Sequence, residues 1–415
     1  QYDNIALALS TVENDVLQNT ADDMMERASW ELGNISAKDA TSIYGKEVAL
    51  SATKMDVYSA CRYHYFLQYG LKLTQAADGR ITSPVFGKFA HAVLEKAVRE
   101  IEKKHGGFQN VTLDQMESIT RKYMDAYIEK KMKGIDKASE RYQYLLKRNC
   151  REIMTIMRNV CDEFKVSDFH GTEFEYRVGG DRADMPDITV RGKRLTGKFS
   201  GIIDRIDVAT VDGEEYIRLA DYKSGKVKTF DKADILVGQS LQLLIYQAAL
   251  QENGLIGREA KAAGVLYVPA KEAVTATKTR AAEDKVLAER QKMLTRRGIL
   301  LDNKDVINAM EHSDGKQCVF LPVKFKADGS ISGDVCSAEQ IDSLNKFAMA
   351  KMKCMLDDIG SGNVEANPLS RGLDRNACSY CPMKDACHKD ICGTRFRYRK
   401  TVKDEEFWKQ VEAES

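Results

Sequence analysis

The segment Gly201-Ile-Ile-Asp204-Arg-Ile-Asp207 and the shorter segment Asp221-Tyr-Lys223 decide the fold that this sequence predicts. In both, side chains alternate with a period of two, which is typical of β-strands, and Asp212-Gly213 between them favours a tight hairpin turn. Asp204 and Asp221 then each lie on an otherwise apolar strand face, where an unpaired carboxylate is costly. Because neighbouring strands are about 5 Å apart, the two carboxylates can share one divalent cation.

Phosphodiester hydrolysis uses a site of this kind. Hard oxygen ligands hold Mg²⁺, which positions and acidifies a water, and an ammonium such as that of Lys223 offsets the charge that grows on the phosphate. The alternative is structural: Asp221 pairs with Lys223 at the end of a strand. Asp204 then pairs with Arg205 or Arg218. Asp-x-Lys alone carries little weight, but the carboxylate strand just upstream favours a site.

Three further polar side chains are candidates for the same site. His91 lies on the flank of an expected helix, where a lone histidine is more often a core or surface residue than a ligand. Gln242 and Tyr246 are one helical turn apart and share a face. Such a pair commonly makes structural hydrogen bonds, so these residues need support from elsewhere in the chain.

The composition limits the class of protein. A chain of 415 residues can hold two or three domains, or one domain with large insertions. No run approaches twenty apolar residues, so no membrane association is predicted, and the net charge of +1 neither supports nor excludes nucleic acid. Ten cysteines without a secretory signal indicate a reducing, cytoplasmic compartment. Gln1 suggests a fragment, and the sequence lacks a Gly-x4-Gly-Lys-Ser/Thr loop for ATP.

Periodicity predicts an α/β protein whose helices precede and follow a group of strands. The expected helices cover 53–69, a segment from Pro84, 112–133, 138–166, 239–252 and 337–358, and residues 1–45 are also predicted to be helical. The expected strands cover 172–178, 198–209, 215–223, 263–268 and 318–326.

The cysteines form a second pattern. Cys61 stands alone, whereas Cys378-Ser-Tyr-Cys381-Pro-Met-Lys-Asp-Ala-Cys387 places three thiols close together more than three hundred residues later. Cys-x2-Cys is a frequent metal-binding spacing, and a third cysteine leaves one ligand to find: Cys61, His388 or Cys392. Zinc and a [4Fe–4S] cluster both accept four thiolates, and the spacing alone favours zinc without separating them.

Taken together, the polar motifs resemble those of RecB-like nucleases of the PD-(D/E)XK superfamily. The matching motifs, in the same order as in the family, are Gly87-x3-His91-x2-Leu94-Glu95, Gly201-x-Ile-Asp204-Arg-x-Asp207, Asp221-Tyr-Lys223-Ser-Gly and Gln242-x3-Tyr246. The resemblance implies that the catalytic metal is held by His91, Asp204, Asp221 and the carbonyl of Tyr222. It also implies that Lys223 is the catalytic lysine and that Gln242 and Tyr246 line the side of the site that faces DNA. Glu173 and Glu175 are near in sequence, but no motif selects either.

The cysteine pattern is similar to the iron–sulfur clasp of the AddB family, the second subunits of AddAB helicase–nucleases. This resemblance covers roughly residues 50–400 and replaces zinc by a structural [4Fe–4S] cluster bound by Cys61, Cys378, Cys381 and Cys387. The family usually has proline after its first cysteine, where this chain has Arg62, a difference that should not affect ligation. The implied partners are single-stranded DNA ends fed from a duplex and an AddA-like helicase–nuclease subunit in a heterodimer that repairs double-strand breaks.

The resemblance also implies a fold and a domain division. The fold is a PD-(D/E)XK core with a central mixed sheet flanked by helices, a helical N-terminal segment, an inserted region and the iron–sulfur clasp. The expected division is 1–50 as a helical remnant of a helicase-like region, 51–400 as the nuclease domain and 401–415 as a C-terminal helix. Within the nuclease domain, the parts are a helical region 51–166, a catalytic core 172–270, an insertion 271–335 and an iron–sulfur segment 376–392.

The predicted reaction is Mg²⁺-dependent exonuclease cleavage of DNA, and two alternatives stay open. One is a stand-alone Cas4-like exonuclease, against which the long insertion argues. The other is a non-catalytic DNA-binding scaffold stapled by zinc. A DNA-binding surface is predicted at Arg395-Phe-Arg397-Tyr-Arg399-Lys400, where cations alternate with aromatics, although a solvated surface stretch explains this segment equally well.

Overall fold

Residues 201–223 fold as the hairpin that the sequence predicts. Strands β5 (Gly201–Val211) and β6 (Glu214–Lys223) are antiparallel neighbours, and the turn residues Asp212 and Gly213 have φ angles of 51° and 80°. A type I′ turn requires positive φ at both central residues, and its twist matches that of the strands. The turn prediction is therefore confirmed.

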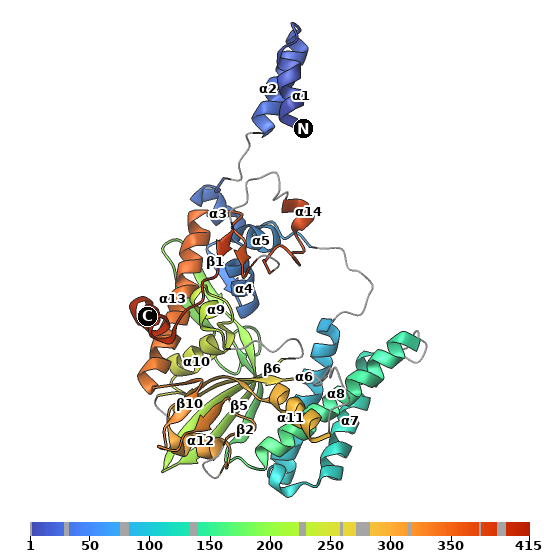
Figure 1. The fold of residues 1–415 in the computed structure, drawn as a ribbon, viewed down its shortest axis with the longest axis vertical. Helices are drawn as coiled ribbons and strands as arrows, with labels where there is room; N and C mark the ends of the chain where they lie inside the picture. Colours follow the sequence, from blue (N-terminus) through green and yellow to red (C-terminus); the bar gives the residue numbers. More distant parts are fainter. Residues whose placement is uncertain are drawn as a thin grey trace.

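This hairpin is the centre of a six-stranded sheet with the order β11-β8-β7-β6-β5-β2 (Figure 1). The structure is a computed structural model that describes residues 2–28, 33–74, 83–132, 140–223, 230–257, 260–270, 283–313, 317–372, 375–387 and 396–415. The pairs β6–β7 and β8–β11 are parallel and the other neighbours antiparallel, so the sheet is mixed, as predicted. Its remaining strands are β2 (His170–Val178), β7 (Lys261–Pro269), β8 (Arg297–Leu301) and β11 (Val335–Cys336).

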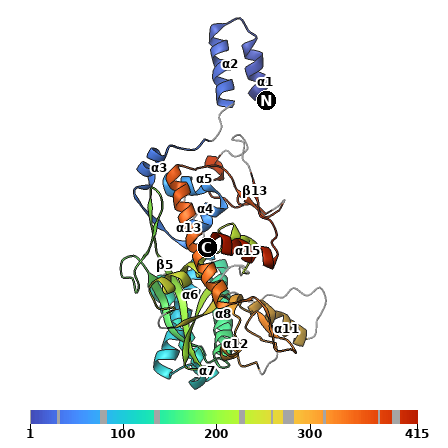
Figure 2. The same cartoon turned by 90° about the vertical axis from the view of Figure 1, so that its left-hand side faces the viewer.

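Helices cover both faces of the sheet (Figures 1 and 2). Leu219 of β6 packs in a cluster with side chains of α10 and α13, whereas its neighbour Ala220 packs with side chains of α6 and α8. This alternation follows from the two-residue period of a strand. The helices concerned are α6 (Ser83–His105), α7 (Leu113–Lys131), α8 (Glu140–Phe164), α10 (Gln242–Glu252) and α13 (Ala338–Ser361). They confirm the α/β class and five of the expected helices.

Smaller elements surround this core. A second sheet has the order β1-β4-β3, and two short pairs join β9 to β10 and β12 to β13. The strand bounds are β1 (Glu47–Leu50), β3 (Ile188–Arg191), β4 (Thr196–Phe199), β9 (Val323–Phe325), β10 (Ile331–Gly333), β12 (Leu369–Ser370) and β13 (Arg397–Tyr398). The other helices of the core are α9 (Lys232–Leu236), α11 (Glu283–Leu294), α12 (Lys304–Met310), α14 (Lys384–Cys387) and α15 (Asp404–Glu414).

The helix predicted over 53–69 is broken at Cys61. The pieces are α4 (Ala52–Ala60), α5 (Arg62–Tyr65) and a π-helical turn (Phe66–Gly70). Cys61 has extended backbone angles, φ −165° and ψ 123°, and the N–H of Arg62 donates to Oδ1 of Asn367 at 3.4 Å. Because Asn367 is distant in sequence, periodicity could not reveal this contact.

Two strand predictions also need correction. The strand predicted over 198–209 is divided, because β4 pairs with β1 and β3 in the small sheet whereas β5 pairs with β2 and β6. Of the strand predicted over 318–326, only β9 forms. In addition, β8 lies within the predicted insertion 271–335 and yet pairs with β7 in the main sheet.

The N-terminal residues are helical, as predicted. Helices α1 (Tyr2–Ser10) and α2 (Asp15–Ala28) lie side by side and project from the rest of the molecule in both views, and α3 (Ala37–Tyr44) follows (Figures 1 and 2). Among the described residues, no helix is both long enough and apolar enough to span a membrane.

Candidate active site and cysteine cavity

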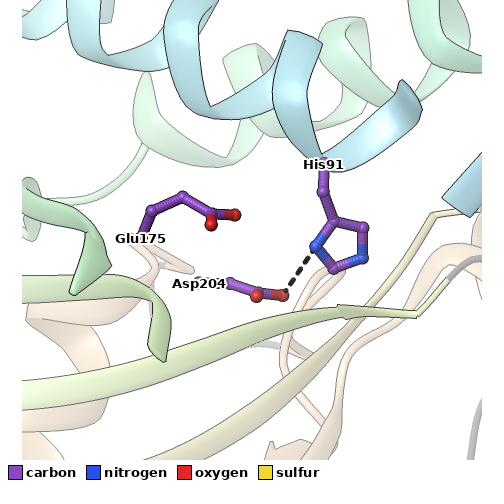
Figure 3. Close-up of side chains that lie close together, drawn as sticks. All are labelled: His91, Glu175 and Asp204. Carbon is purple, nitrogen blue, oxygen red and sulfur yellow. Dashed lines mark ion pairs between the residues drawn. The ribbon is translucent and has the colours of Figure 1, made fainter. Parts of the chain in front are cut away.

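Two acidic side chains and a histidine converge between α6 and the strands β2 and β5 (Figure 3). One ligand atom each of His91, Glu175 and Asp204 lies within 4.8 Å of the others. Nδ1 of His91 is 3.2 Å from Oδ2 of Asp204. These side chains line an open pocket together with residues of the first turns of α6, such as Gly87 and Lys88. Nitrogen and carboxylate oxygen atoms at this spacing can hold a divalent cation that enters from solvent.

Asp221 lies next to this group on β6. Arg205 pairs with Ala220 in the antiparallel register, so Asp204 and Asp221 occupy neighbouring positions on the two strands. The Asp221 side chain is buried, its Oδ1 accepts a hydrogen bond from Nε2 of Gln242 at 2.9 Å, and Lys223 forms an ion pair with it. Burial, and then the charge of Asp204, raise the pKa of Asp221 to about 6.

Gln242 joins the acid to the lysine. Its Oε1 accepts a hydrogen bond from Nζ of Lys223 at 2.9 Å while its Nε2 donates to Asp221. Because one amide holds both charged groups, a single residue at the N-terminus of α10 fixes the orientation of the acid and of the ammonium. The rest of this motif, Ser224-Gly225, lies outside the described residues.

Tyr246 supports the start of β5. Its ring is buried, and its hydroxyl accepts a hydrogen bond from the N–H of Ile202 at 3.1 Å. A Cβ atom at Gly201 would lie only 2.5 Å from this hydroxyl, so glycine at that position gives the tyrosine the room it needs. The predicted position of Tyr246 on a DNA-facing surface stays a prediction.

Tyr222 orients Asp204 through its backbone. The N–H of Tyr222 donates to Oδ2 of Asp204 at 2.7 Å, and its buried hydroxyl accepts from Nη1 of Arg205 at 2.8 Å. The side chain therefore faces the opposite side of the sheet from Asp221 and Lys223. The role of the Tyr222 carbonyl as a metal ligand stays a prediction.

A buried ion network decides against the structural alternative for Asp204. Nε of Arg205 lies 2.7 Å from Oδ1 of Asp207, and Nη2 of Arg218 lies 2.8 Å from Oδ2 of the same carboxylate. Arg218 also reaches Glu163, which pairs with Arg296 at 2.6 Å. All these side chains are buried. Since Asp207 neutralises both arginines that the alternative assigned to Asp204, Asp204 is available to the cluster with His91.

Register selects Glu175 over Glu173, a choice that no motif could make. β2 pairs Phe174 with Arg205 and Tyr176 with Ile203, so Glu175 stands opposite Asp204. Its φ of 51° is in the left-handed region, an irregularity that reorients the side chain locally. Burial and the neighbouring carboxylate of Asp204 raise the pKa of Glu175, as expected where acids gather without a bound cation.

Mn²⁺ is expected to bind this cluster more weakly as the pH falls through about 6, with release of protons. The pKa of Asp221 is about 6. Burial acts to lower the pKa of His91, but the bond and charge of Asp204 outweigh burial and raise it. A cation needs the ionised carboxylate and the neutral imidazole, so protons compete with it, up to tenfold in affinity per pH unit and per proton. Calorimetric titrations at about pH 8 and about pH 5 would measure this, and equal affinities would contradict the assignment.

The predicted cysteines are brought together. Cys61, Cys378, Cys381 and Cys387 line one cavity, although Cys61 is separated from the others by the whole sheet region of the sequence. The extended backbone at Cys61 interrupts the helix there. Oδ1 of Asn376 accepts the N–H of Cys378 at 3.0 Å and shapes the turn that carries the first two clustered thiols. Four thiols around a cavity fit a polynuclear cluster that fills the space between them. His388 and Cys392 lie outside the described residues.

The arginines of the basic segment make structural contacts. Nε of Arg397 donates to the carbonyl of Asn367 at 2.8 Å, and its Nη2 donates to that of Ser59. Nη1 of Arg399 lies 3.0 Å from Oδ1 of Asp234 on α9. These contacts tie the chain after the cysteines to α4 and α9, so the two side chains are largely used within the protein. Arg395 lies outside the described residues.

Comparison with known proteins gives a family and a set of relatives. A model of the family described as the PD-(D/E)XK nuclease superfamily matches residues 49–388. The chain is 30% identical over 390 residues to the B-type subunit of the ATP-dependent helicase/deoxyribonuclease of Clostridium acetobutylicum, an alignment that covers 92% of this chain and 33% of the relative. The protein of the same name from Caldanaerobacter subterraneus is 29% identical over 377 residues, covering 90% and 32%. The chain spans about a third of the length of these curated relatives.

Proposed function

The chain belongs to the PD-(D/E)XK nuclease superfamily, and we propose that it hydrolyses phosphodiester bonds at DNA ends as an Mg²⁺-dependent exonuclease. The observation that carries this proposal is the convergence of His91, Glu175 and Asp204 beside the buried Asp221 and its partner Lys223. An acid–lysine pair next to a cluster of hard ligands matches the needs of phosphate chemistry.

The residues that would hold Mg²⁺ are Asp204, Asp221 and His91, as the family resemblance implies, and the structure adds Glu175. When bound, the cation would position and acidify the attacking water and polarise the phosphate. The ammonium of Lys223 contributes positive charge where the phosphate becomes more negative. Gln242 keeps Asp221 and Lys223 in a fixed mutual orientation, so little reorganisation is needed during the reaction.

We further propose that Cys61, Cys378, Cys381 and Cys387 bind a [4Fe–4S] cluster. Four thiolates occupy every external position of such a cluster, which makes its role structural. The cluster would join the chain before the sheet to the chain after it and hold α4, α5 and α14 around one centre.

The names of the relatives support a place in a larger machine. We propose that this chain is the nuclease part of an AddB-like subunit that works in the cytoplasm with an AddA-like helicase–nuclease subunit on double-strand breaks. Alignment of about nine-tenths of the chain with these long subunits favours this interpretation over a stand-alone Cas4-like exonuclease. The ligand cluster with its lysine favours it over a non-catalytic scaffold.

Purified protein, alone and with its AddA-like partner subunit, is expected to degrade end-labelled linear single-stranded DNA in Mg²⁺. Circular single-stranded DNA of the same sequence should survive, because an exonuclease needs an end. EDTA should stop the reaction. If linear DNA stays intact in Mg²⁺ and in Mn²⁺, with and without the partner subunit, the proposed activity is wrong.

A further inference from the structure

One row of side-chain positions crosses the sheet from the metal-binding cluster to its far side. Asp221 of β6 is the register partner of Tyr267 of β7, and Tyr267 is the register partner of Arg297 of β8. Register partners point to the same face of a sheet, so Asp221 and Arg297 share a face. Two strand spacings separate them, about 10 Å.

The charge changes sign along this row. The acids Glu175, Asp204 and Asp221 stand on β2, β5 and β6, whereas the half-buried Arg297 stands on β8. From these positions we propose that Arg297, with neighbouring lysines, forms a separate subsite that binds a backbone phosphate of the DNA strand being cleaved. This inference rests on the proposed function for the identity of the strand.

The subsite is a basic pocket. Arg297 lines it together with Lys292 from α11 and Lys324 from β9, and the described residues of its wall include no Asp or Glu. The wall also offers polar side chains that can donate hydrogen bonds to phosphate oxygens: Thr295, Gln317 and Ser332. The pocket encloses about 970 Å³ of empty space, enough for a phosphodiester and its sugar.

The nearby acids do not neutralise these cations. Lys292 pairs with Glu289 on its own helix, but both side chains are largely exposed, and such pairs are weak. Asp334 is close enough to feel the charges of Lys232 and Arg297, and it is half-buried outside the pocket wall. In the described part of the chain, Lys324 makes no ion pair within 4.0 Å. The pocket therefore keeps a net positive charge.

The spacing suits a second contact on one nucleic-acid strand. About 10 Å corresponds to roughly three phosphates at the rise of 3.4 Å per nucleotide of a B-form strand. A guanidinium can bind a phosphate through two parallel hydrogen bonds, and the position of Arg297 is fixed by its strand. Exposed lysines without such a pocket would only be solvated. Here a strand with its reacting phosphate at Asp204 and Asp221 reaches the pocket within a few nucleotides.

The test compares the variant R297Q/K324Q with the parent and with Lys326→Gln. Lys326 is an exposed lysine on the same hairpin that does not line the pocket, so it controls for loss of charge alone. Binding of a fluorescent sixteen-nucleotide oligothymidylate is measured in Ca²⁺ by anisotropy at several salt concentrations. The double variant is expected to bind about tenfold more weakly, with the slope of log K against log salt reduced by about 1.4, which is two contacts at about 0.7 each.

A second readout separates this subsite from the metal centre. Hydrolysis of the p-nitrophenyl ester of thymidine 5′-phosphate, which has no neighbouring nucleotide, is expected to be the same in the parent and the variant. A variant that binds the oligonucleotide with parental affinity and salt slope overturns the subsite, and so does an equal loss on the small ester. If the parent hydrolyses neither substrate, the proposed activity fails, while the anisotropy result still decides the subsite. Lys324→Gln alone, at an exposed position, gives half the slope change if R297Q misfolds.

Discussion

Asp221→Asn is expected to reduce hydrolysis of linear single-stranded DNA at least about a thousandfold, which corresponds to about 4 kcal/mol of transition-state stabilisation. Asparagine keeps the size of the side chain and an Oδ1 that can accept the hydrogen bond from Gln242. The substitution removes the charge that would hold the cation and that pairs with Lys223. Loss of a charged metal ligand costs several kcal/mol in such sites. Initial rates in Mg²⁺ measure the effect, and anisotropy in Ca²⁺ should show that DNA binding survives.

Asp212→Asn is the matched control for this variant. Asp212 is exposed at the turn of the same hairpin, and asparagine tolerates its φ of 51°. The control should therefore keep both the fold and the parental rate. If Asp221→Asn also cleaves at the parental rate, the carboxylates of β5 and β6 are not the metal ligands, and the assignment of the site is wrong.

Local patterns predicted the hairpin because its information is local. A period of two and Asp212-Gly213 specify two strands and the turn between them. The same pattern correctly placed Asp204 and Asp221 on neighbouring strands. It could not predict that Asp207 would neutralise Arg205 and Arg218, because alternation gives the face of a residue and not its partner.

The parts of the site that depend on tertiary contacts were not predictable from the sequence. Glu175 joins the cluster through the register of β2 against β5, and Glu173, two residues away, has the same chemistry and alternation. The break at Cys61 follows from a bond between Arg62 and the distant Asn367, whereas the apolar period runs through the break without interruption. Strand β8 was assigned to an insertion because its pairing with β7 leaves no mark on neighbouring residues.

Cys381→Ser is expected to lose the iron–sulfur cluster and to lower the thermal unfolding midpoint by on the order of 10 °C. The cluster would close a loop of more than three hundred residues between Cys61 and Cys387. Closing a loop of that length stabilises the folded state by about 6 kcal/mol in the chain-entropy model. The cavity between the thiols would also lose its contents, and apolar neighbours such as Leu67 and Met383 would lose packing contacts.

Cys354→Ser separates this effect from the loss of any thiol. Cys354 is exposed on α13 and does not line the cysteine cavity, so its variant should keep the parental iron and sulfide content and the parental unfolding midpoint. The measurements are iron and acid-labile sulfide per chain after anaerobic purification, with calorimetric unfolding of both variants. A Cys381→Ser protein with the parental iron content would remove this residue from the ligand set. Stoichiometric zinc without iron in the parent would instead make the clasp a zinc site, because both centres use four thiolates.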